Sequence, residues 1–274
     1  MPRQDNAAAG SQRPILPRSA LAKKAENGYP AQPFVTRKPV SGWTLLCDFD
    51  GTISVEDTTD TLLERFGKPG WEVLENDWRA GRINSHDCMA GQVALLDMSQ
   101  AELDAYLAER AIDAAFPQFV AAAQAQNLPI EILSDGLDYA IHSILSHYDL
   151  DWLPVTANRL QAVGEREWRL AFPNASRNCS VASGTCKCAR AARFQGPRKY
   201  ILMIGDGASD FCVTGAADFV FAKGKLIDYC RVHNIPHAPI EGFSDALALL
   251  PALVSGKLVA ATRAAAALPK VVSA

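Results

Sequence analysis

From Trp43 onward, short apolar runs alternate with stretches in which apolar residues recur at helical spacing. The candidate buried strands are Thr44–Cys47, Pro129–Leu133, Tyr200–Ile204 and Phe219–Ala222, and the intervening helical stretches include 117–127, 138–147 and 208–216. Strands separated by helices predict a parallel sheet with crossover helices, so we expect an α/β core of Rossmann-like type. Three of the runs end in polar residues, at the edge where ligands bind in such sheets.

Residues 57–114 break this alternation, because only helical periodicity is visible there. The helical stretches are Thr58–Phe66, Gly70–Ala80, Ser85–Asp97 and Gln100–Arg110. We expect a small helical bundle inserted after the first strand, with an internal core of apolar residues at helical spacing: Leu62, Leu63, Phe66, Trp71, Leu74 and Trp78. A second insertion near 159–172 has the pattern of a hairpin.

The predicted organisation is therefore a discontinuous core, a helical cap and two terminal segments. The core comprises residues 41–56 and 115–255, the cap 57–114, and the C-terminal tail 256–274. Residues 1–40 hold seven basic and two acidic residues and show no periodicity, which is typical of a disordered basic arm.

Charge and composition exclude several classes of protein. The 274 residues carry a net charge of −3, so no surface for nucleic acid is expected. No stretch approaches the roughly 20 apolar residues that cross a bilayer, and the first 30 residues lack a secretory apolar segment. The odd number of cysteines, seven, then favours reduced thiols in the cytoplasm. The sequence leaves the oligomeric state open.

The first strand leads into Asp48-Phe49-Asp50-Gly51-Thr52. Two close carboxylates repel each other unless a proton or a cation lies between them, so a divalent metal would explain the pair. One carboxylate could attack an electrophile while the other transfers a proton. An acidic surface turn is the alternative for this pair taken alone.

A second acidic cluster, Gly205-Asp206-Gly207-Ala208-Ser209-Asp210, follows another strand and favours the metal interpretation. Mg²⁺ prefers hard oxygen ligands and needs only one or two protein carboxylates, which Asp48 and Asp206 could supply. Ser134 ends the intervening strand, where its hydroxyl and the following backbone N–H groups could bind a phosphate. Lys187 begins a helical stretch and could neutralise the transferred group, although a solvated helix lysine is the alternative.

These residues resemble the four ordered motifs of the haloacid dehalogenase-like hydrolase superfamily: Asp48-x-Asp50-Gly51-Thr52, Ser134, Lys187 and Gly205-Asp206-Gly207-x-x-Asp210. The helical insertion after the first motif resembles the cap of the phosphoserine phosphatase subgroup. Within it, the chain is similar to the 2-hydroxy-3-keto-5-methylthiopentenyl-1-phosphate phosphatase-like proteins of methionine salvage. That similarity is carried by Asp57, the Trp71–Glu75 region, Ser134-x-Gly136-x-Asp138 and the cysteine-bearing segment before Lys187.

The resemblance implies a role for each matching position. Asp48 would be the nucleophile, and Asp50 the general acid and base whose backbone carbonyl also binds Mg²⁺. Lys187 completes the catalytic set. The expected metal ligands are Asp48, Asp50, Asp206 and Asp210, and the expected substrate or phosphate contacts are Thr52, Asp57, Ser134, Asp135 and Gly136. Asp135 and the short Asp57 depart from the phosphoserine phosphatase pattern, so serine phosphate is a doubtful substrate.

The predicted function is Mg²⁺-dependent hydrolysis of a small phosphorylated metabolite through an aspartyl-phosphate, with the methionine-salvage enol phosphate as one candidate. A phosphoserine phosphatase, a phosphotransferase and a regulatory protein with a vestigial site remain alternatives. The spacing of Cys179, Cys186 and Cys188 lacks the paired pattern and fourth ligand of structural zinc, so free thiols are expected and zinc is the open alternative.

Overall fold

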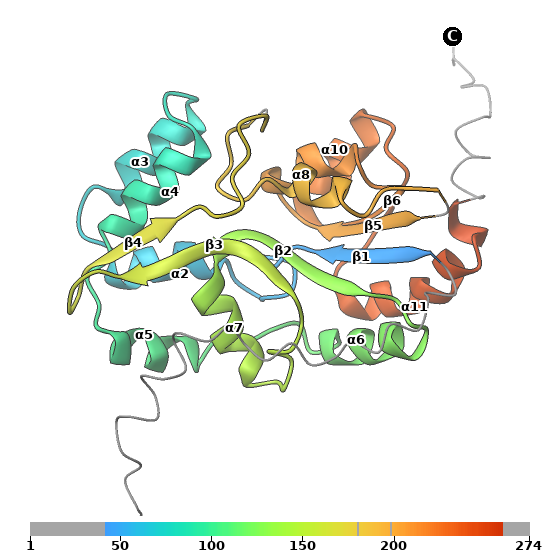
Figure 1. Ribbon diagram of the computed structural model, residues 1–274, viewed down its shortest axis with the longest axis horizontal. Coiled ribbons are helices and arrows are strands. Elements are labelled where there is room, and N and C mark those ends of the chain that lie inside the picture. Colours follow the sequence, from blue (N-terminus) through green and yellow to red (C-terminus); the bar gives the residue numbers. More distant parts are fainter. Residues whose placement is uncertain (1–41, 180, 198, 260–274) are drawn as a thin grey trace, which may run out of the picture. The chain divides into compact units, whose positions relative to one another are not determined.

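A seven-stranded sheet runs through the described part of the chain (Figure 1). The computed structural model describes residues 42–259 except positions 180 and 198. In the order β4-β3-β2-β1-β5-β6-β7, every neighbouring pair is parallel except β3 and β4. The strands are β1 Trp43–Cys47, β2 Ile130–Leu137, β3 Val155–Ala162, β4 Trp168–Ala171, β5 Tyr200–Gly205, β6 Phe219–Ala222 and β7 His237–Pro239. The predicted α/β class is confirmed.

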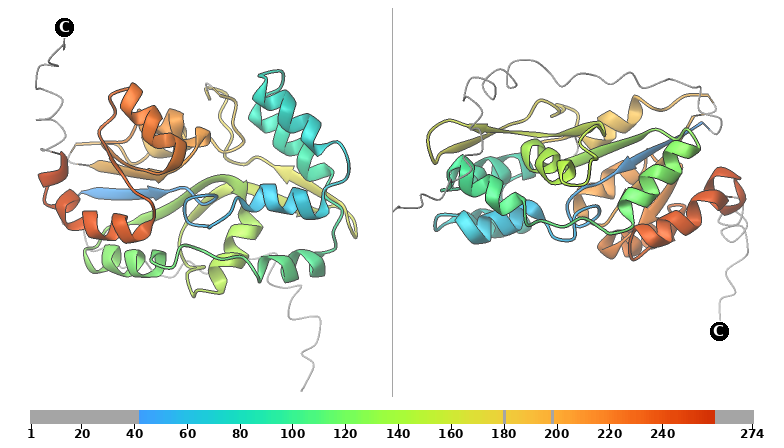
Figure 2. Two further views of the ribbon diagram at one scale, coloured as in Figure 1. Left: turned by 180° about the vertical axis from the view of Figure 1, so that it is seen from behind. Right: turned by 90° about the horizontal axis from the view of Figure 1, so that it is seen from below.

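Helices cover both faces of the sheet because alternate strand residues point to opposite sides. In β1, Leu45 and Cys47 join one buried cluster, whereas Leu46 joins the other. The first cluster includes residues of α6, α7 and α11, and the second includes residues of α8 and α10, which lie on the opposite side (Figures 1 and 2). With labels as in Figure 1, these helices are α6 Phe116–Ala125, α7 Asp138–Ser146, α8 Lys187–Ala192, α10 Gly224–Val232 and α11 Phe243–Val254. The short helix α9, Phe211–Thr214, lies between β5 and β6 in the sequence.

The order of the strands places β1 between β2 and β5, where the direction of chain winding reverses. Cys47 is in register with Ile132 of β2 and with Ile204 of β5, and Asp48 N donates to Ile204 O at 2.9 Å. The chain segments that follow these three strands therefore meet at one edge. A crevice at such a reversal is where open α/β sheets bind ligands.

Strand β2 is longer than the apolar run Pro129–Leu133 predicted, and it continues to Leu137. Its pairing with β3 is irregular, because Leu133 pairs with Thr156 and Leu137 with Asn158. Four steps along β2 thus match two steps along β3, which is a bulge. The Ser134-Asp135-Gly136 segment lies in this bulge and not in a turn beyond the strand.

Residues 57–114 form α2 Thr58–Phe66, α3 Trp71–Arg79, α4 Ser85–Ala94 and α5 Gln100–Leu107, close to the predicted ranges. Three of these helices begin at residues whose side chains accept a backbone N–H of the first turn: Asp57, Asn84 and Ser99. The sequence therefore sets the helix starts in this segment locally. Its action as a cap stays a prediction.

The predicted internal core of this segment is only partly correct. Leu62 and Leu63 are fully buried, but α3 has no buried residue and Trp78 is 38% exposed. Helix α3 packs mainly on α4, where Leu74 lies against Gly91. A helix with one packing partner leaves most of its circumference accessible, so the prediction of Trp78 as core is wrong.

The predicted hairpin is confirmed by β3 and β4, which pair from Arg159↔Ala171 to Ala162↔Trp168. Trp168 is 5% exposed, and its indole N–H donates to Met98 O at 2.8 Å, which fastens the hairpin to residues of the helical segment. Within the described residues, every helix is too short or too polar to cross a membrane. The predicted arm, 1–40, and most of the predicted tail, 260–274, lie outside the described residues.

Candidate active site

Asp48 follows β1 directly and is succeeded by a tight turn of the backbone. Asp48 is 4% exposed, and its Oδ1 accepts Phe49 N at 2.8 Å. The backbone then folds back, with the N–H groups of Thr52 and Ile53 donating to Phe49 O at 3.2 and 2.8 Å. Gly51 has φ +69°, and a Cβ there would lie 2.8 Å from Asp206 Oδ2, so this position needs glycine.

Lys187 is the first residue of α8 and is 1% exposed, so the alternative of a solvated helix lysine is wrong. Its Nζ lies 2.8 Å from Asp48 Oδ1 and donates to Asp210 Oδ1 at 2.6 Å. Burial disfavours the ammonium, but Asp210 and Asp48 outweigh it and raise the pKa of Lys187. The lysine is therefore a fixed positive charge between two carboxylates.

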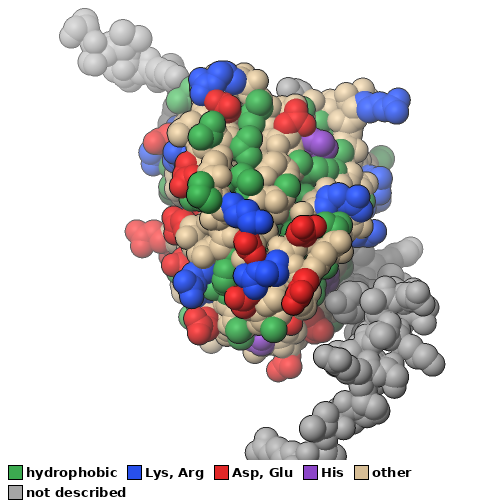
Figure 3. Space-filling view, turned by 90° about the vertical axis from the view of Figure 1, so that its left-hand side faces the viewer, with side chains coloured by type: hydrophobic (Ala, Val, Ile, Leu, Met, Phe, Trp, Pro, Cys, Tyr) green, Lys and Arg blue, Asp and Glu red, His purple; other side chains and the backbone are tan. Residues whose placement is uncertain are grey.

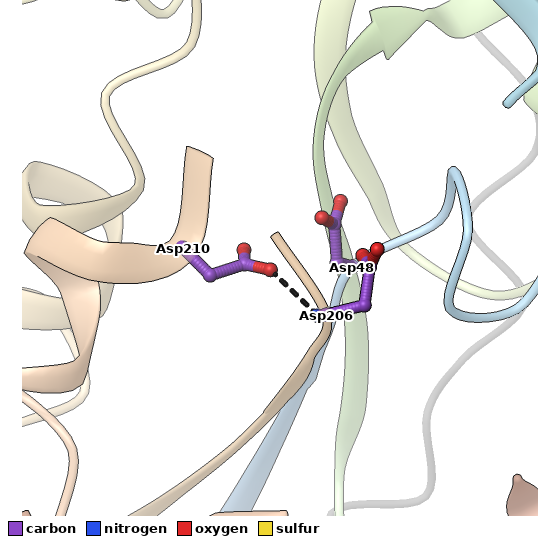
Figure 4. A group of neighbouring side chains, drawn as sticks. All are labelled: Asp48, Asp206 and Asp210. Carbon is purple, nitrogen blue, oxygen red and sulfur yellow. Dashed lines mark hydrogen bonds between the residues drawn. The ribbon is translucent and has the colours of Figure 1, made fainter. Parts of the chain in front are cut away.

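The loop after β5 brings Asp206 and Asp210 to Asp48 (Figure 4). One carboxylate oxygen of each lies within 4.8 Å of the others, so the three form a group that could hold a metal ion. Thr52 Oγ1 donates to Asp206 Oδ1 at 3.0 Å, and Asp210 Oδ2 accepts Asp206 N at 3.1 Å. Burial and the nearby Asp48 raise the pKa of Asp206, and the hydrogen bond from Thr52 opposes this shift.

Asp50 connects the loop to the start of α2. Its Oδ1 accepts Thr58 N at 2.9 Å, and burial, opposed by this bond and assisted by Asp48, raises its pKa to about 6. Asp57 is the N-cap of α2 and its Oδ1 accepts Asp60 N at 2.9 Å. Although Asp57 is accessible to solvent, desolvation in this crowded loop and the carboxylate of Asp50 raise its pKa.

The bulge in β2 brings Ser134 and Gly136 close to Asp50, whereas the Asp135 carboxylate points toward Thr185. Ser134 is 1% exposed, and its Oγ accepts Gly136 N at 2.9 Å. A Cβ on Gly136 would overlap Asp50 Oδ2, so the bulge and the first loop are in close contact. Asp135 Oδ1 accepts Thr185 N at 2.8 Å, within a separate polar network.

The haloacid dehalogenase-like hydrolase family model matches residues 45–214, which span β1 to α9 and all of these side chains. The chain belongs to this family. The predicted resemblance is confirmed, and the class of enzyme that it implied, a phosphatase, is confirmed with it.

Two curated relatives carry the name 2-hydroxy-3-keto-5-methylthiopentenyl-1-phosphate phosphatase. The protein of Geobacillus kaustophilus (strain HTA426) is 31% identical over 206 residues, covering 74% of this chain and 93% of the relative. That of Brevibacillus brevis (strain 47 / JCM 6285 / NBRC 100599) is 29% identical over 209 residues, covering 75% and 94%. A solved phosphoserine phosphatase, a phospho-aspartyl intermediate analogue, matches with a TM-score of 0.58 and 16% identity over 74% of this chain and 96% of its own. At that identity the likeness concerns the fold.

Sequence reasoning missed two polar contacts of this family site. Ser209 Oγ accepts a hydrogen bond from Lys187 Nζ at 3.2 Å and lies 3.4 Å from Asp48 Oδ2. Lys223, after β6, donates from Nζ to Gly51 O at 2.9 Å. Ser209 stands inside the second acidic motif and could have been found there, but nothing in the sequence near Lys223 indicates its contact.

The seven cysteines are free thiols, of which Cys47, Cys88, Cys186 and Cys230 are buried and the others partly buried. Within residues 42–259, apart from the two undescribed positions, the carboxylate trio is the one group of potential ligands close enough to hold a metal. Cys179, Cys186 and Cys188, for which zinc was the open alternative, form no such group.

Proposed function

We propose that this phosphatase hydrolyses a small phosphomonoester with Mg²⁺ through an aspartyl-phosphate on Asp48. The observation that carries the proposal is the position of Lys187 Nζ, 2.8 Å from Asp48 Oδ1 and 2.6 Å from Asp210 Oδ1. A buried ammonium against the nucleophile is placed to attract an anionic group to Asp48 and to stabilise the charge that develops during its transfer.

The donor set of the proposed metal site consists of hard oxygens, which suit Mg²⁺. Asp48 and Asp206 would hold the ion directly with the backbone carbonyl of Asp50. Asp210 would act mainly by fixing the loop, because its Oδ1 already accepts Lys187 Nζ and its Oδ2 accepts two backbone N–H groups. When bound, Mg²⁺ would neutralise phosphoryl oxygens and lower their repulsion from the carboxylates.

In the first chemical step, an Asp48 carboxylate oxygen would bond to phosphorus while the bond from phosphorus to the ester oxygen breaks. Asp50 would give its proton to that leaving oxygen. In the second step, Asp50 would take a proton from water, whose oxygen bonds to phosphorus and displaces Asp48, so that inorganic phosphate leaves. A pKa of about 6 makes both protonation states of Asp50 accessible near neutrality. Lys187 and Ser134 would hold the phosphoryl group in both steps.

Residues 57–114 would act as the cap that excludes water, with Asp57 at its first hinge facing the substrate. Thr52 and Gly136 would shape the phosphate site, since one orients Asp206 and the other leaves space for Asp50. The names of the curated relatives make the methionine-salvage enol phosphate the first substrate to test. The free thiols fit a reducing cytoplasm.

Phosphate release from a panel of phosphorylated metabolites with Mg²⁺ tests the proposal. The panel includes the enol phosphate, phosphoserine, pyridoxal phosphate and sugar phosphates. We expect release by the wild type and by the exposed control Asp228→Asn, and a loss on the order of 10⁴-fold in Asp48→Asn. The wild type should also form a covalent phosphoryl label that hydroxylamine removes, and Asp48→Asn should not.

Retained release or retained label in Asp48→Asn would contradict the mechanism. A new phosphoester on addition of an acceptor alcohol, in place of free phosphate, would identify a phosphotransferase. Absence of release from every compound would favour a regulatory protein.

A further inference from the structure

The carboxylate of Asp135 lies where three parts of the chain meet. Its Oδ1 accepts Thr185 N at 2.8 Å and Asn158 Nδ2 at 3.1 Å, and its Oδ2 accepts Ser85 Oγ at 3.2 Å. These partners come from the loop before α8, from β3 and from α4. Three donors on one carboxylate leave little capacity for a further ligand, and a substrate phosphate would be repelled.

Two of these partners also bind each other and close a buried polar triangle with Asp135. Asn158 is 0% and Thr185 1% exposed, and Thr185 Oγ1 donates to Asn158 Oδ1 at 3.0 Å. Asn158 Nδ2 also donates to Asp135 O at 2.6 Å, which satisfies the carbonyl group freed by the bulge in β2. The bond between Thr185 and Asn158 is buried, and those to Asp135 are partly buried, so breaking one leaves a polar group with little access to water.

The triangle connects the two phosphate-binding elements of the proposed site. Ser134 precedes Asp135 in the bulge, and Lys187 follows Thr185 by two residues at the start of α8. A Cβ on Gly184, next to Thr185, would come within 2.7 Å of Asn158 Oδ1, so the loop is packed against the amide. The hydrogen bonds of Asp135 therefore connect the Ser134 bulge with the loop that leads to Lys187.

The third partner extends this connection to the helical segment. Ser85 is the first residue of α4, and the next residue, His86, donates its backbone N–H to Ala182 O at 3.2 Å. The His86 ring also lies on Phe172, with the ring centroids 3.9 Å apart. The start of α4 thus contacts the 172–185 loop at two points and the Asp135 carboxylate of β2 at a third.

We propose that Asp135 is a positioning residue, which joins the phosphate-binding bulge of β2 and Lys187 to the start of α4 and so couples closure of the helical segment to an ordered phosphate site. This inference rests on the proposed function. It replaces the expectation that Asp135 binds substrate: the side chain orders residues that do.

Steady-state kinetics of Ser85→Ala, Asp135→Ala and the double variant test the coupling. Loss of one hydrogen bond to a charged group should lower kcat/KM about fivefold in Ser85→Ala, mainly through KM, because the closed state becomes less populated. Asp135→Ala should lower kcat/KM about 50-fold, through both a lower kcat and a higher KM, because the polar triangle opens. The double variant should match Asp135→Ala, and Asp135→Asn, which keeps an acceptor for Thr185 N, should recover most activity.

Ser99→Ala is the matched control, because it removes a helix-start bond in the same segment without touching Asp135. Its kcat/KM should stay within about twofold of the wild type. Additive effects of Ser85→Ala and Asp135→Ala would overturn the coupling. Tighter competitive inhibition by inorganic phosphate in Asp135→Ala would overturn it too, because it would mean that the carboxylate faces the bound anion.

Hydrogen exchange separates a failure of this inference from a failure of the proposed function. Asp135→Ala should exchange faster than the wild type in residues 84–90 and 182–187, whether or not any substrate is hydrolysed. Unchanged exchange in both segments would overturn the inference even if phosphate release is measured. Faster exchange in Asp135→Ala, together with no phosphate release from any compound by the wild type, would support the positioning role of Asp135 and refute the proposed phosphatase mechanism alone.

Discussion

The carboxyl edge of the sheet and the helical segment 57–114 differ in the burial of the side chains assigned to the proposed site. At the sheet edge, Asp48, Lys187 and Asp210 are 4%, 1% and 0% exposed and bind one another. In the helical segment, Asp57 is accessible and Trp78 is 38% exposed. The face at the α3 and α4 end carries acidic, basic and apolar side chains intermixed (Figure 3).

This difference would separate the proposed chemistry from the proposed recognition of the substrate. Charges that must keep their geometry during bond making lie in buried segments at the carboxyl edge of the sheet, where packing and mutual pairing fix them. Side chains that would meet a substrate lie on helices with accessible faces, where replacement costs little stability. Variants at the sheet edge should therefore damage both stability and activity, whereas variants of the accessible side chains in the helical segment should change stability little.

The largest effect is expected from Lys187→Met, which leaves Asp48 and Asp210 buried without their common counter-charge. The free energy of unfolding should fall by about 3–5 kcal/mol, and kcat by on the order of 10³-fold. Denaturant unfolding and phosphate release measure the two effects, with the exposed Lys225→Met as the matched control. A stable Lys187→Met variant with kcat within tenfold of the wild type would contradict the view that the buried charges at the sheet edge carry both stability and catalysis.

Gly136→Ala should reduce activity with a smaller effect on stability. The added methyl group would overlap Asp50 Oδ2 and force that carboxylate away from Thr58 N. Because small displacements of a catalytic group are costly, kcat should fall about 10²-fold. Gly215→Ala, whose methyl group would lie 3.7 Å from Cys212 O in ordinary contact, should keep full activity in the same assay.

Mg²⁺ should stabilise the protein more at pH 8 than at pH 5. Burial and the nearby Asp48 raise the pKa of Asp206, one of the proposed ligands, so protons compete with Mg²⁺ for this carboxylate at the lower pH. A carboxylate with a raised pKa contributes stability that is present at low pH and lost as the pH rises through that pKa. Mg²⁺ at 100 times its Kd would add about 2.7 kcal/mol at pH 8. Thermal unfolding at both pH values measures this. Asp206→Asn should lose the Mg²⁺ shift and Asp228→Asn should keep it; equal shifts at both pH values would refute the expectation.

Trp78→Ala should have the smallest effect on stability. Because the indole is partly exposed on a helix without buried residues, the free energy of unfolding should change by less than about 0.5 kcal/mol. Phe221→Ala, in fully buried β6, should instead cost about 3–5 kcal/mol. A raised KM for the best substrate with an unchanged free energy of unfolding would support a role of α3 in substrate binding. A loss of more than about 2 kcal/mol in the free energy of unfolding would instead show that α3 belongs to the core.

The apolar runs predicted the strands well because both faces of a parallel sheet are buried, and a fully buried strand needs apolar side chains throughout. The run Phe219–Ala222 coincides with β6. The helix starts at Asp57 and Ser99 are also determined by neighbouring residues, because the side chain of each cap residue accepts the backbone N–H of the residue three positions later. The bulge at Ser134 was not predictable, because it depends on Asn158, which is 24 positions away.

By itself, the sequence determined the α/β class, the order of the motifs and the residues of the proposed chemistry, because strand burial and helix capping act over a few neighbouring positions. Only the tertiary structure decided that Lys187 is buried between Asp48 and Asp210, that Trp78 is accessible and that the Asp135 carboxylate serves Thr185, Asn158 and Ser85. Burial and charge pairing depend on which distant segments meet. That is set by how the helices and strands pack, and no local pattern contains it.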